Sequence, residues 1–253
     1  MIDIHSHILP GVDDGSDSID TSLEMLSMAS ESGVKAIFAT PHANEPGGFR
    51  NYSSEKLQSV LSELRQTAAA EGIPIKICRG MEIFASDDLP ELLREGIVWT
   101  MNGTRYFLTE FNFDEDPDFC FDVLARCRYF GFRPIVAHPE RYFFIQDDPQ
   151  LAYELCMNGS ALQINKGSLL GRFGPEAEET AELLIEHHLA ACVASDAHGA
   201  GIRTTDMLEI ADLLNDRWGN RTAKLLLREN PARIIAGERL LGYEPIPFED
   251  QPI

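Results

Sequence analysis

Basic residues are scarce in this chain of 253 residues. It carries 21 lysines and arginines against 41 aspartates and glutamates, which gives a formal net charge of −20 at pH 7. A surface this acidic repels nucleic acid and anionic lipid, because both are polyanions. We therefore expect neither a nucleic-acid-binding protein nor a protein that binds membranes through charge.

Paired cysteines and long apolar runs are also missing. The cysteines are odd in number and none has the C-x-x-C spacing: Cys78, Cys120, Cys127, Cys156 and Cys192. This pattern argues against a disulfide framework and against a zinc-thiolate site. No apolar run approaches the roughly 20 residues of a membrane helix, and the start of the chain lacks the basic flank of a signal peptide. These absences predict a cytoplasmic protein that does not insert into membranes.

Short apolar runs that alternate with helical patterns are abundant. The runs that predict strands are residues 2–8, 34–40, 75–83, 106–111, 134–137, 161–164 and 190–194. Helices are predicted at residues 19–30, 54–71, 117–130, 175–188, 204–218, 222–229 and 231–237. Several strand candidates are almost continuously aliphatic, as in strands buried on both faces. The alternation predicts an α/β fold with a parallel sheet, closed or nearly closed into a barrel. We expect a single domain over residues 1–253, with residues 245–253 as an extended tail.

Residues that commonly bind metals fall at the carboxyl ends of these predicted strands. They are His5, His7, His42, Glu82, Glu110, His138, Asp196 and His198. In a parallel barrel those ends share one rim, where the chemistry occurs. Each residue alone is better explained as a strand end bonded to a loop, but eight of them at one rim are not. An unpartnered carboxylate such as Glu82, buried beside apolar strands, would cost on the order of several kcal/mol. By contrast, His187 and His188 lie at the end of the helix predicted at 175–188 and are expected to be surface residues near its negative pole.

The first strand and the turn after it strengthen the metal hypothesis. His5 and His7 are two residues apart, so their side chains point the same way from a strand. The turn at residues 9–15 brings two carboxylates back toward the rim, and we expect Asp14 rather than Asp13 to join the cluster. Imidazole and carboxylate ligands without thiolate favour Mn²⁺, Fe²⁺ or Zn²⁺ over Ca²⁺. Two divalent ions would only neutralise the four carboxylates, whereas three would leave the centre positive and attract a phosphate dianion.

Five motifs then follow one another in an order typical of a known family. They are Asp3-Ile4-His5-Ser6-His7-Ile8-Leu9-Pro10-Gly11-Val12-Asp13-Asp14-Gly15, Thr40-Pro41-His42, Gly80-Met81-Glu82, His138-Pro139-Glu140-Arg141-Tyr142 and Ser195-Asp196-Ala197-His198. Over nearly its whole length the chain resembles the PHP (polymerase and histidinol phosphatase) superfamily. More closely, it resembles the bacterial manganese-dependent protein-tyrosine phosphatases of capsule and exopolysaccharide synthesis. The resemblance implies a distorted (β/α)₇ TIM-like barrel with three metal ions, most often manganese.

The resemblance also implies roles for individual residues. One metal would be bound by His5, His7, Glu82 and Asp196, a second by Glu82, Glu110 and His138, and a third by Asp14, His42 and His198. Arg141, in the HPERY motif, and Arg203, matched by its distance from His198, would bind the substrate phosphate. Asp14, like these two arginines, is a candidate catalytic residue. Residues 43–50 depart from the longer basic or histidine-containing segment of the family, so the role of the 43–52 loop stays open.

We expect the reaction to be phosphotyrosine hydrolysis by a metal-activated water, without a phosphoenzyme. The family implies a phosphotyrosine protein as partner, the tail of a bacterial tyrosine autokinase. Two C-x₅-R spacings, which start at Cys120 and Cys127, match cysteine-dependent phosphatases. The first has no glycine to form a phosphate-binding loop, and the second begins inside the same predicted helix, so we interpret both as coincidence.

Three other functions remain open at this point. A phosphatase of histidinol phosphate or of a nucleotide would share every ligand, although residues 9–15 favour the tyrosine phosphatases. A metal-dependent amidohydrolase also uses H-x-H on a barrel, but commonly with a carbamylated lysine at a strand end, where this chain offers Glu82 as the bridging carboxylate. A non-catalytic scaffold that keeps metal for stability would be favoured by missing ligands, and no ligand is missing.

Overall fold

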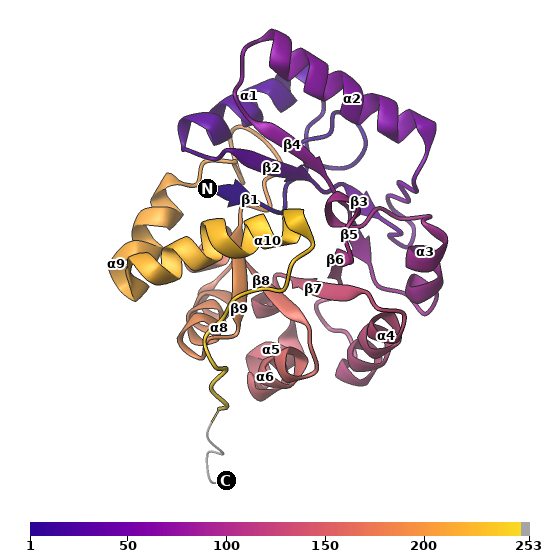
Figure 1. The fold of residues 1–253 in the computed structure, drawn as a ribbon. Helices are drawn as coiled ribbons and strands as arrows, with labels where there is room; N and C mark the ends of the chain where they lie inside the picture. Colours follow the sequence, from indigo (N-terminus) through magenta and orange to yellow (C-terminus); the bar gives the residue numbers. More distant parts are fainter. Residues whose placement is uncertain (249–253) are drawn as a thin grey trace.

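The computed structural model describes residues 1–248, with strands at the centre and helices around them (Figure 1). The strands are β1 (Ile2–Asp3), β2 (Ala36–Ala39), β3 (His42–Ala43), β4 (Lys76–Arg79), β5 (Glu82–Phe84), β6 (Tyr106–Glu110), β7 (Arg133–Ala137), β8 (Ala161–Asn165) and β9 (Ala190–Ala194). Every strand pair within these residues is parallel. The predicted α/β fold with a parallel sheet is therefore confirmed.

Hydrogen bonding divides the strands into two sheets, ordered β1-β2-β4 and β3-β5-β6-β7-β8-β9. The division falls at two breaks, one between β2 and β3, after the strand predicted at 34–40, and one inside the strand predicted at 75–83. Pro41, between β2 and β3, has no N–H to donate to the ladder. Gly80, between β4 and β5, lies so close to Met101 that a Cβ there would be 2.8 Å from the Met101 sulfur.

The first and last strands are also connected to each other. Ser6 and Ala197 form a parallel bridge, and the Asp196 N–H donates to the His5 carbonyl oxygen at 2.9 Å. Together with the two sheets, these bonds lead from the last strand back to the first, as expected for a distorted barrel.

The helices cover the outside of the strands. They are α1 (Ile19–Glu31), α2 (Glu55–Ala70), α3 (Leu89–Glu95), α4 (Pro117–Tyr129), α5 (Phe143–Asp147), α6 (Gln150–Met157), α7 (Lys166–Leu169), α8 (Pro175–Glu186), α9 (Leu208–Lys224) and α10 (Asn230–Ala236). The 3₁₀ turns η1 (Met101–Gly103) and η2 (Pro139–Arg141) and the π-helical η3 (Leu225–Glu229) complete the set. Ser18 and Ser54 cap α1 and α2 by accepting backbone N–H bonds, as serine commonly does. Among residues 1–248, no helix has both the length and the hydropathy needed to cross a bilayer.

The helix predictions were wrong in two respects. The short helices α3, α5, α6 and α7 were not predicted, and the predicted helix at 204–218 begins four residues late, at Leu208. Side chains from elsewhere hold the backbone before Leu208 out of helical geometry, because Lys166 donates to the Thr204 and Asp206 carbonyl oxygens. The predicted end at residue 218 coincides with a kink inside α9, at Gly219.

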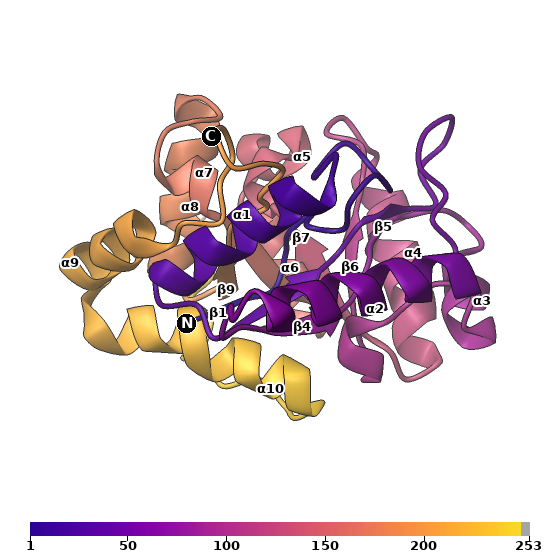
Figure 2. The same cartoon turned by 90° about the horizontal axis from the view of Figure 1, so that it is seen from above.

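Apolar side chains fill the inside of the ring of strands as well as the space between strands and helices. The inner cluster includes Ile4, Phe38, Cys78, Leu108, Ile135, Ala194 and, from α10, Ile234. Figure 2 shows α10 at one end of the barrel and α7 toward the other. Since α10 covers the amino-terminal ends of the strands, their carboxyl-terminal ends remain for chemistry. Of the expected tail, residues 245–248 form no helix or strand, and residues 249–253 lie outside the described part of the chain.

Candidate metal centre

All nine side chains predicted as metal ligands lie at the carboxyl-terminal rim. Three groups of them place one ligand atom per residue within 4.8 Å of one another: His5, His7, Glu82 and Asp196; His42, Glu82 and Glu110; and His7, Asp14, His42 and His198. The ninth residue, His138, contacts Glu82 through its Nε2 atom, 2.9 Å from Glu82 Oε1.

The first group is buried at the bottom of the site. Glu82 Oε2 lies 3.0 Å from His5 Nε2 and 3.2 Å from His7 Nε2. Asp196 Oδ1 lies 3.5 Å from the same two nitrogens. All four side chains are at most 2% exposed, so water cannot separate their charges.

The hydrogen bonds of the first group leave it suited to bind a cation. His5 Nδ1 lies 2.7 Å from Gln163 Oε1, and His7 Nδ1 lies 2.9 Å from Asp13 Oδ2. Both oxygens accept, so each ring keeps a proton on Nδ1 and turns Nε2 toward Glu82, where Nε2 can bind a cation once its own proton is displaced. Glu82 Oε2 is buried and has no hydrogen-bond partner. A divalent cation among these atoms would satisfy the lone pairs and the oxygen together.

Glu82 also faces the second group of side chains. Its Oε1 atom contacts His138, while Glu110 Oε1 lies 3.0 Å from His42 Nδ1 and Glu110 Oε2 lies 3.9 Å from His138 Nε2. The two oxygens of Glu82 therefore point to different sets of partners, as a bridging carboxylate requires. His42 lies between two groups, since its Nδ1 faces Glu110 and its Nε2 faces Asp14.

The third group lies at the mouth of the site. Asp14 Oδ1 is 3.4 Å from His198 Nε2 and 3.5 Å from His42 Nε2, and the Asp14 side chain is 55% exposed. The hydrogen bond to His198 lowers the pKa of Asp14 to about 2. Asp14 is therefore a carboxylate at neutral pH.

The imidazoles and carboxylates shift each other's pKa values in opposite directions. Burial alone would lower the pKa of His42, but the hydrogen bond to Glu110 and the charge of Glu82 raise it to about 9. Burial alone would raise the pKa of Glu82, but His5 and His138 hold it well below its usual value. Protons thus compensate the negative charge in the cluster, and a bound cation would displace them.

Both predicted arginines reach the same rim. The Arg141 guanidinium lies between the rings of Phe113 and Phe173, 4.5 Å and 4.4 Å from their centroids. The Nη2 atom of Arg203 lies 2.6 Å from Asp196 Oδ2. The two arginines and seven of the nine predicted ligands, all except His5 and His7, line one hollow of about 360 Å³. A phosphate bound over the metals would therefore meet guanidinium groups.

The backbone is strained at this rim. His138, Asp196 and Arg203 have φ values of 35°, 49° and 51°, in the left-handed region that costs side-chain-bearing residues about 1–3 kcal/mol each. Such strain persists only where the surrounding structure imposes it. Here it lies at two predicted ligands and at one predicted phosphate-binding arginine.

Three supporting residues were missed from the sequence. Asp13 accepts from the backbone N–H of His42 at 3.1 Å as well as from His7. Gln163 bonds to His5, and Asn165 Nδ2 donates to Asp196 Oδ2 at 2.6 Å. The polar Gln163 stands out within the apolar run at 161–164, and Asn165 follows it directly, as the strand-end ligands follow theirs; this signal could have identified both.

Two other candidate groups do not face the cluster. Lys166 follows β8 directly, the strand-end position of a bridging carbamylated lysine, but its amine bonds to the Thr204 and Asp206 carbonyl oxygens. Cys120 and Cys127 are fully buried on α4, and burial raises the pKa of Cys127 to about 12. Neither thiol is placed or ionised to act as a nucleophile.

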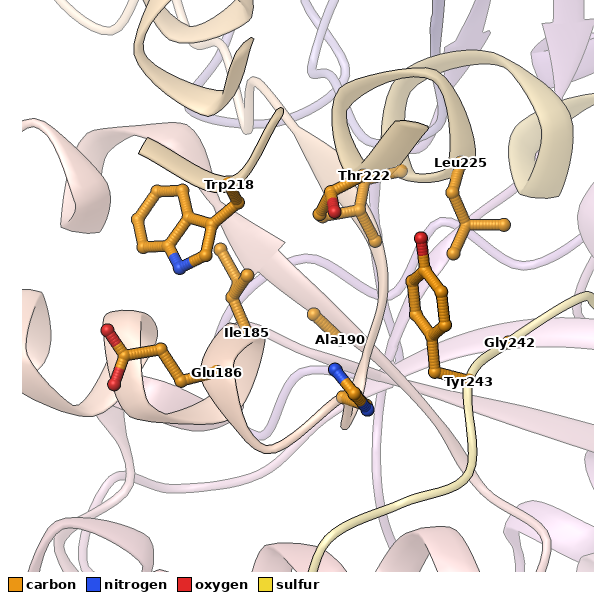
Figure 3. Close-up of a pocket in the computed structure, with 10 residues that line it drawn as sticks. Ile185, Glu186, Ala190, Trp218, Thr222, Leu225, Gly242 and Tyr243 are labelled. Carbon is orange, nitrogen blue, oxygen red and sulfur yellow. The ribbon is translucent and has the colours of Figure 1, made fainter. Parts of the chain in front are cut away.

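A separate hollow of about 260 Å³ lies near the amino-terminal end of β9 (Figure 3). Trp218 and Tyr243 flank it, and Ile185, Glu186 and Ala190 line it. None of the groups of metal-binding side chains found within residues 1–248 lies there. The three groups lie instead at the opposite end of the barrel.

Known proteins share both the sequence and the fold. The model of the family described as "Capsular polysaccharide synthesis, CpsB/CapC" matches residues 1–236. Tyrosine-protein phosphatase YwqE of Bacillus subtilis is 33% identical over 249 residues, which cover 98% of this chain and 97% of that protein. The putative tyrosine-protein phosphatase CapC of Staphylococcus aureus is 35% identical over 219 residues, which cover 86% of this chain and 83% of that protein.

A solved structure extends the similarity to the whole fold. It is described as YwqE from Bacillus subtilis and CpsB from Streptococcus pneumoniae, "unique metal-dependent tyrosine phosphatases". It matches this chain with a TM-score of 0.92 at 32% identity, over 98% of this chain and 100% of the other. With the family model covering nearly the whole chain and relatives above 30% identity, this protein belongs to the CpsB/CapC family of capsular polysaccharide synthesis.

Proposed function

We propose that this chain is a metal-dependent protein-tyrosine phosphatase that acts in capsular or exopolysaccharide synthesis. The main observation is that nine imidazoles and carboxylates cluster at one rim, where seven of them and two arginines line a single hollow. The names of the relatives, which are tyrosine-protein phosphatases, support this function. So does the solved relative described as metal-dependent.

The proposed metal ligands follow the sequence prediction. His5, His7, Glu82 and Asp196 hold one ion, Glu82, Glu110 and His138 hold a second, and Asp14, His42 and His198 hold a third. We propose Mn²⁺ because the ligands are imidazole and carboxylate. Three divalent ions would leave the cluster positively charged, which suits a dianionic phosphate in an otherwise acidic protein.

The bound ions would supply a Lewis acid for the phosphoryl oxygens and lower the pKa of water. Arg141 presents a planar pair of donors to the phosphate, and the two phenylalanine rings beside it hold its guanidinium in place. Arg203 lies across the same hollow and adds positive charge there. Asp14, whose pKa the hydrogen bond from His198 lowers to about 2, is ionised and can act as a ligand or a proton acceptor. Tyrosine needs little help from an acid, because phenolate is a fair leaving group.

We propose that the substrate is a phosphotyrosine protein, the tail of a tyrosine autokinase. With a chain charge of −20, attraction of an acidic phosphopeptide must come from the site itself and not from the surface as a whole. The five free cysteines fit a reducing compartment, and we place the protein in the cytoplasm.

The decisive assay compares a phosphotyrosine peptide with histidinol phosphate and a nucleoside monophosphate as substrates. Each is supplied with Mn²⁺, Fe²⁺, Zn²⁺ or Mg²⁺, with an EDTA control and elemental analysis of the purified protein. We expect the peptide to be turned over fastest, Mn²⁺ to activate most and EDTA to abolish turnover. Faster hydrolysis of histidinol phosphate would make this protein a small-molecule phosphatase. No hydrolysis of any phosphoester with every metal would contradict an enzymatic function.

A further inference from the structure

A second hollow lies beside the catalytic one, on the other side of Arg141. This phenylalanine groove encloses about 450 Å³ and is lined by Phe113, Arg141, Phe143, Gln146, Phe173, Glu176 and Ala177. Phe113 and Arg141 also line the hollow over the metal cluster. The groove is therefore continuous with the proposed active site, and a substrate phosphate held by Arg141 would lie at the junction.

The rings of the groove are unusually exposed. The side chain of Phe143 is 54% exposed and that of Phe113 is 39% exposed. Aromatic rings are normally buried, and exposed apolar clusters commonly mark surfaces where another molecule binds. Arg141 already covers one face of Phe113 and of Phe173, whereas Phe143 has no such cover within the described residues.

The groove is built from parts that hold one another in place. The Phe143 backbone N–H donates to the Phe113 carbonyl oxygen at 2.8 Å. Phe173 lies so close to α7 that a Cβ on Gly167 would be 2.5 Å from the ring. Beneath the groove, the buried Tyr142 ring stacks on Phe144 with an interplanar angle of 5°. A ligand would thus meet a preformed surface and would lose little affinity to ordering of the protein.

The polar groups of the groove limit what it can accept. Glu176 lies in the first turn of α8 and contributes a carboxylate at the edge. The Gln146 amide already donates to the Glu140 carbonyl oxygen at 2.8 Å. Arg141 is engaged by two rings and turned toward Asp196. The remaining surface is apolar and aromatic, so an uncharged aromatic side chain fits and an acidic one is repelled by Glu176.

We propose that the phenylalanine groove binds an aromatic side chain that flanks the phosphotyrosine in a peptide substrate. This inference rests on the proposed phosphatase function and adds a specificity site to it. An extended peptide advances about 3.3 Å per residue, so the flanking ring belongs within about three residues of the phosphotyrosine. The groove would then select among phosphotyrosine sites, while Arg141 and the metals would treat all of them alike.

The test uses the full-length Mn²⁺-loaded enzyme and a panel of phosphotyrosine peptides with a glycine-serine background. One phenylalanine, or in a parallel series one glutamate, is moved through about three positions on either side. The small substrate p-nitrophenyl phosphate, which has no flanking residue, is assayed beside them. We expect phenylalanine at one position to raise kcat/KM about fivefold over the background peptide, mostly by lowering KM. This factor corresponds to the stabilisation that one aromatic pair commonly contributes. Glutamate at that position should lower it.

Variants then assign the preference to the groove. In Phe143→Ala the advantage of the favoured peptide should disappear, and Phe143→Leu should keep part of it. Glu176→Gln should relieve the penalty of glutamate. The matched control is Tyr129→Ala, an aromatic residue of α4 that is 85% exposed and lies at the amino-terminal end of the barrel. It should leave all the kcat/KM ratios unchanged.

Three outcomes would overturn the inference, and they can be told apart. If all peptides are hydrolysed equally well, the groove does not select and the proposed function stands. If Phe143→Ala lowers p-nitrophenyl phosphate turnover as much as peptide turnover, the groove holds the tyrosine ring itself. If the wild-type enzyme hydrolyses no phosphoester, the proposed function fails and the groove assignment fails with it.

Discussion

The two ends of the barrel both carry histidines but use them differently. At the carboxyl-terminal rim, five histidines point their ring nitrogens at carboxylates. At the amino-terminal end, His187 Nδ1 lies 3.0 Å from the Ile246 carbonyl oxygen and His188 Nδ1 lies 3.1 Å from that of Glu244. The first set faces anionic groups with unsatisfied atoms, and the second anchors the C-terminal segment. A histidine therefore indicates a site through its partners and not through its presence.

The contrast has a structural origin in the barrel itself. Helix α10 and the segment after it cover the amino-terminal strand ends, where Arg133 donates to Gly237 and the Tyr106 hydroxyl donates to Glu238. At the other end, the buried carboxylate oxygen Glu82 Oε2 has no hydrogen-bond donor. Metal ions would resolve that imbalance at the rim. Four substitutions, taken from the largest expected effect to the smallest, test whether chemistry is confined to the rim.

The largest effect is expected from His42→Ala. His42 lies between two groups of the cluster, so its loss should disturb two metal positions and lower kcat at least about 10³-fold. Elemental analysis should show less bound Mn²⁺, with unchanged circular dichroism. His188→Ala, at the other end of the barrel, is the control and should retain wild-type kcat. Equal losses in the two variants would contradict the division between the ends.

Arg141→Ala should lower kcat/KM about 10²-fold, because it removes donors that bind the charged phosphate. Arg141→Lys should recover little, since an ammonium cannot offer a planar pair of donors. Bound Mn²⁺ should stay at the wild-type level in both, which separates this role from that of His42. Arg217→Ala is the matched control, because Arg217 also lies over an aromatic ring, 4.7 Å from the centroid of Trp218, but far from the rim. A fully active Arg141→Ala enzyme would exclude Arg141 from phosphate binding.

Asp13→Asn tests the layer of residues behind the ligands. Asp13 Oδ2 accepts from the His7 ring and the His42 N–H, and Oδ1 accepts from the Gly15 N–H, so an amide would remove the charge that orients His7 and would replace one of these acceptors with a donor. We expect a 10- to 100-fold weaker apparent affinity for Mn²⁺, about the size of other supporting-residue effects, with kcat largely restored at saturating metal. Asp20→Asn, an exposed position on α1, is the control. An unchanged Mn²⁺ titration would mean that Asp13 has no role in orienting the ligands.

The sequence predicted the metal-binding residues at the rim better than the residues that hold them in place. The predicted ligands end apolar runs and are conspicuous there, as with Glu82 after residues 75–81. The sequence favoured Asp14 over Asp13 as a ligand but assigned Asp13 no role, because only the backbone of the turn decides which groups this carboxylate contacts. The start of α9 was misplaced because Lys166, distant in sequence, holds residues 204–206. Phe143 belongs to no sequence motif. It stands out only because its ring is exposed to solvent, which a sequence does not show.

The smallest effect is expected from Cys127→Ser, which tests whether cysteine chemistry occurs away from the rim. Because burial raises the pKa of Cys127 to about 12, almost none of this thiol is ionised near pH 7.5. Its C-x₅-R partner, Arg133, is engaged with the Gly237 carbonyl oxygen at 3.0 Å and is not free to bind phosphate. We expect kcat/KM to stay within about twofold of wild type and iodoacetamide to leave the native enzyme active. A buried hydroxyl should lower the unfolding free energy by about 1–3 kcal/mol, visible as a Tm lower by a few degrees. Loss of turnover with intact metal content would instead place the nucleophile on α4. It would show that the reaction does not take place at the rim.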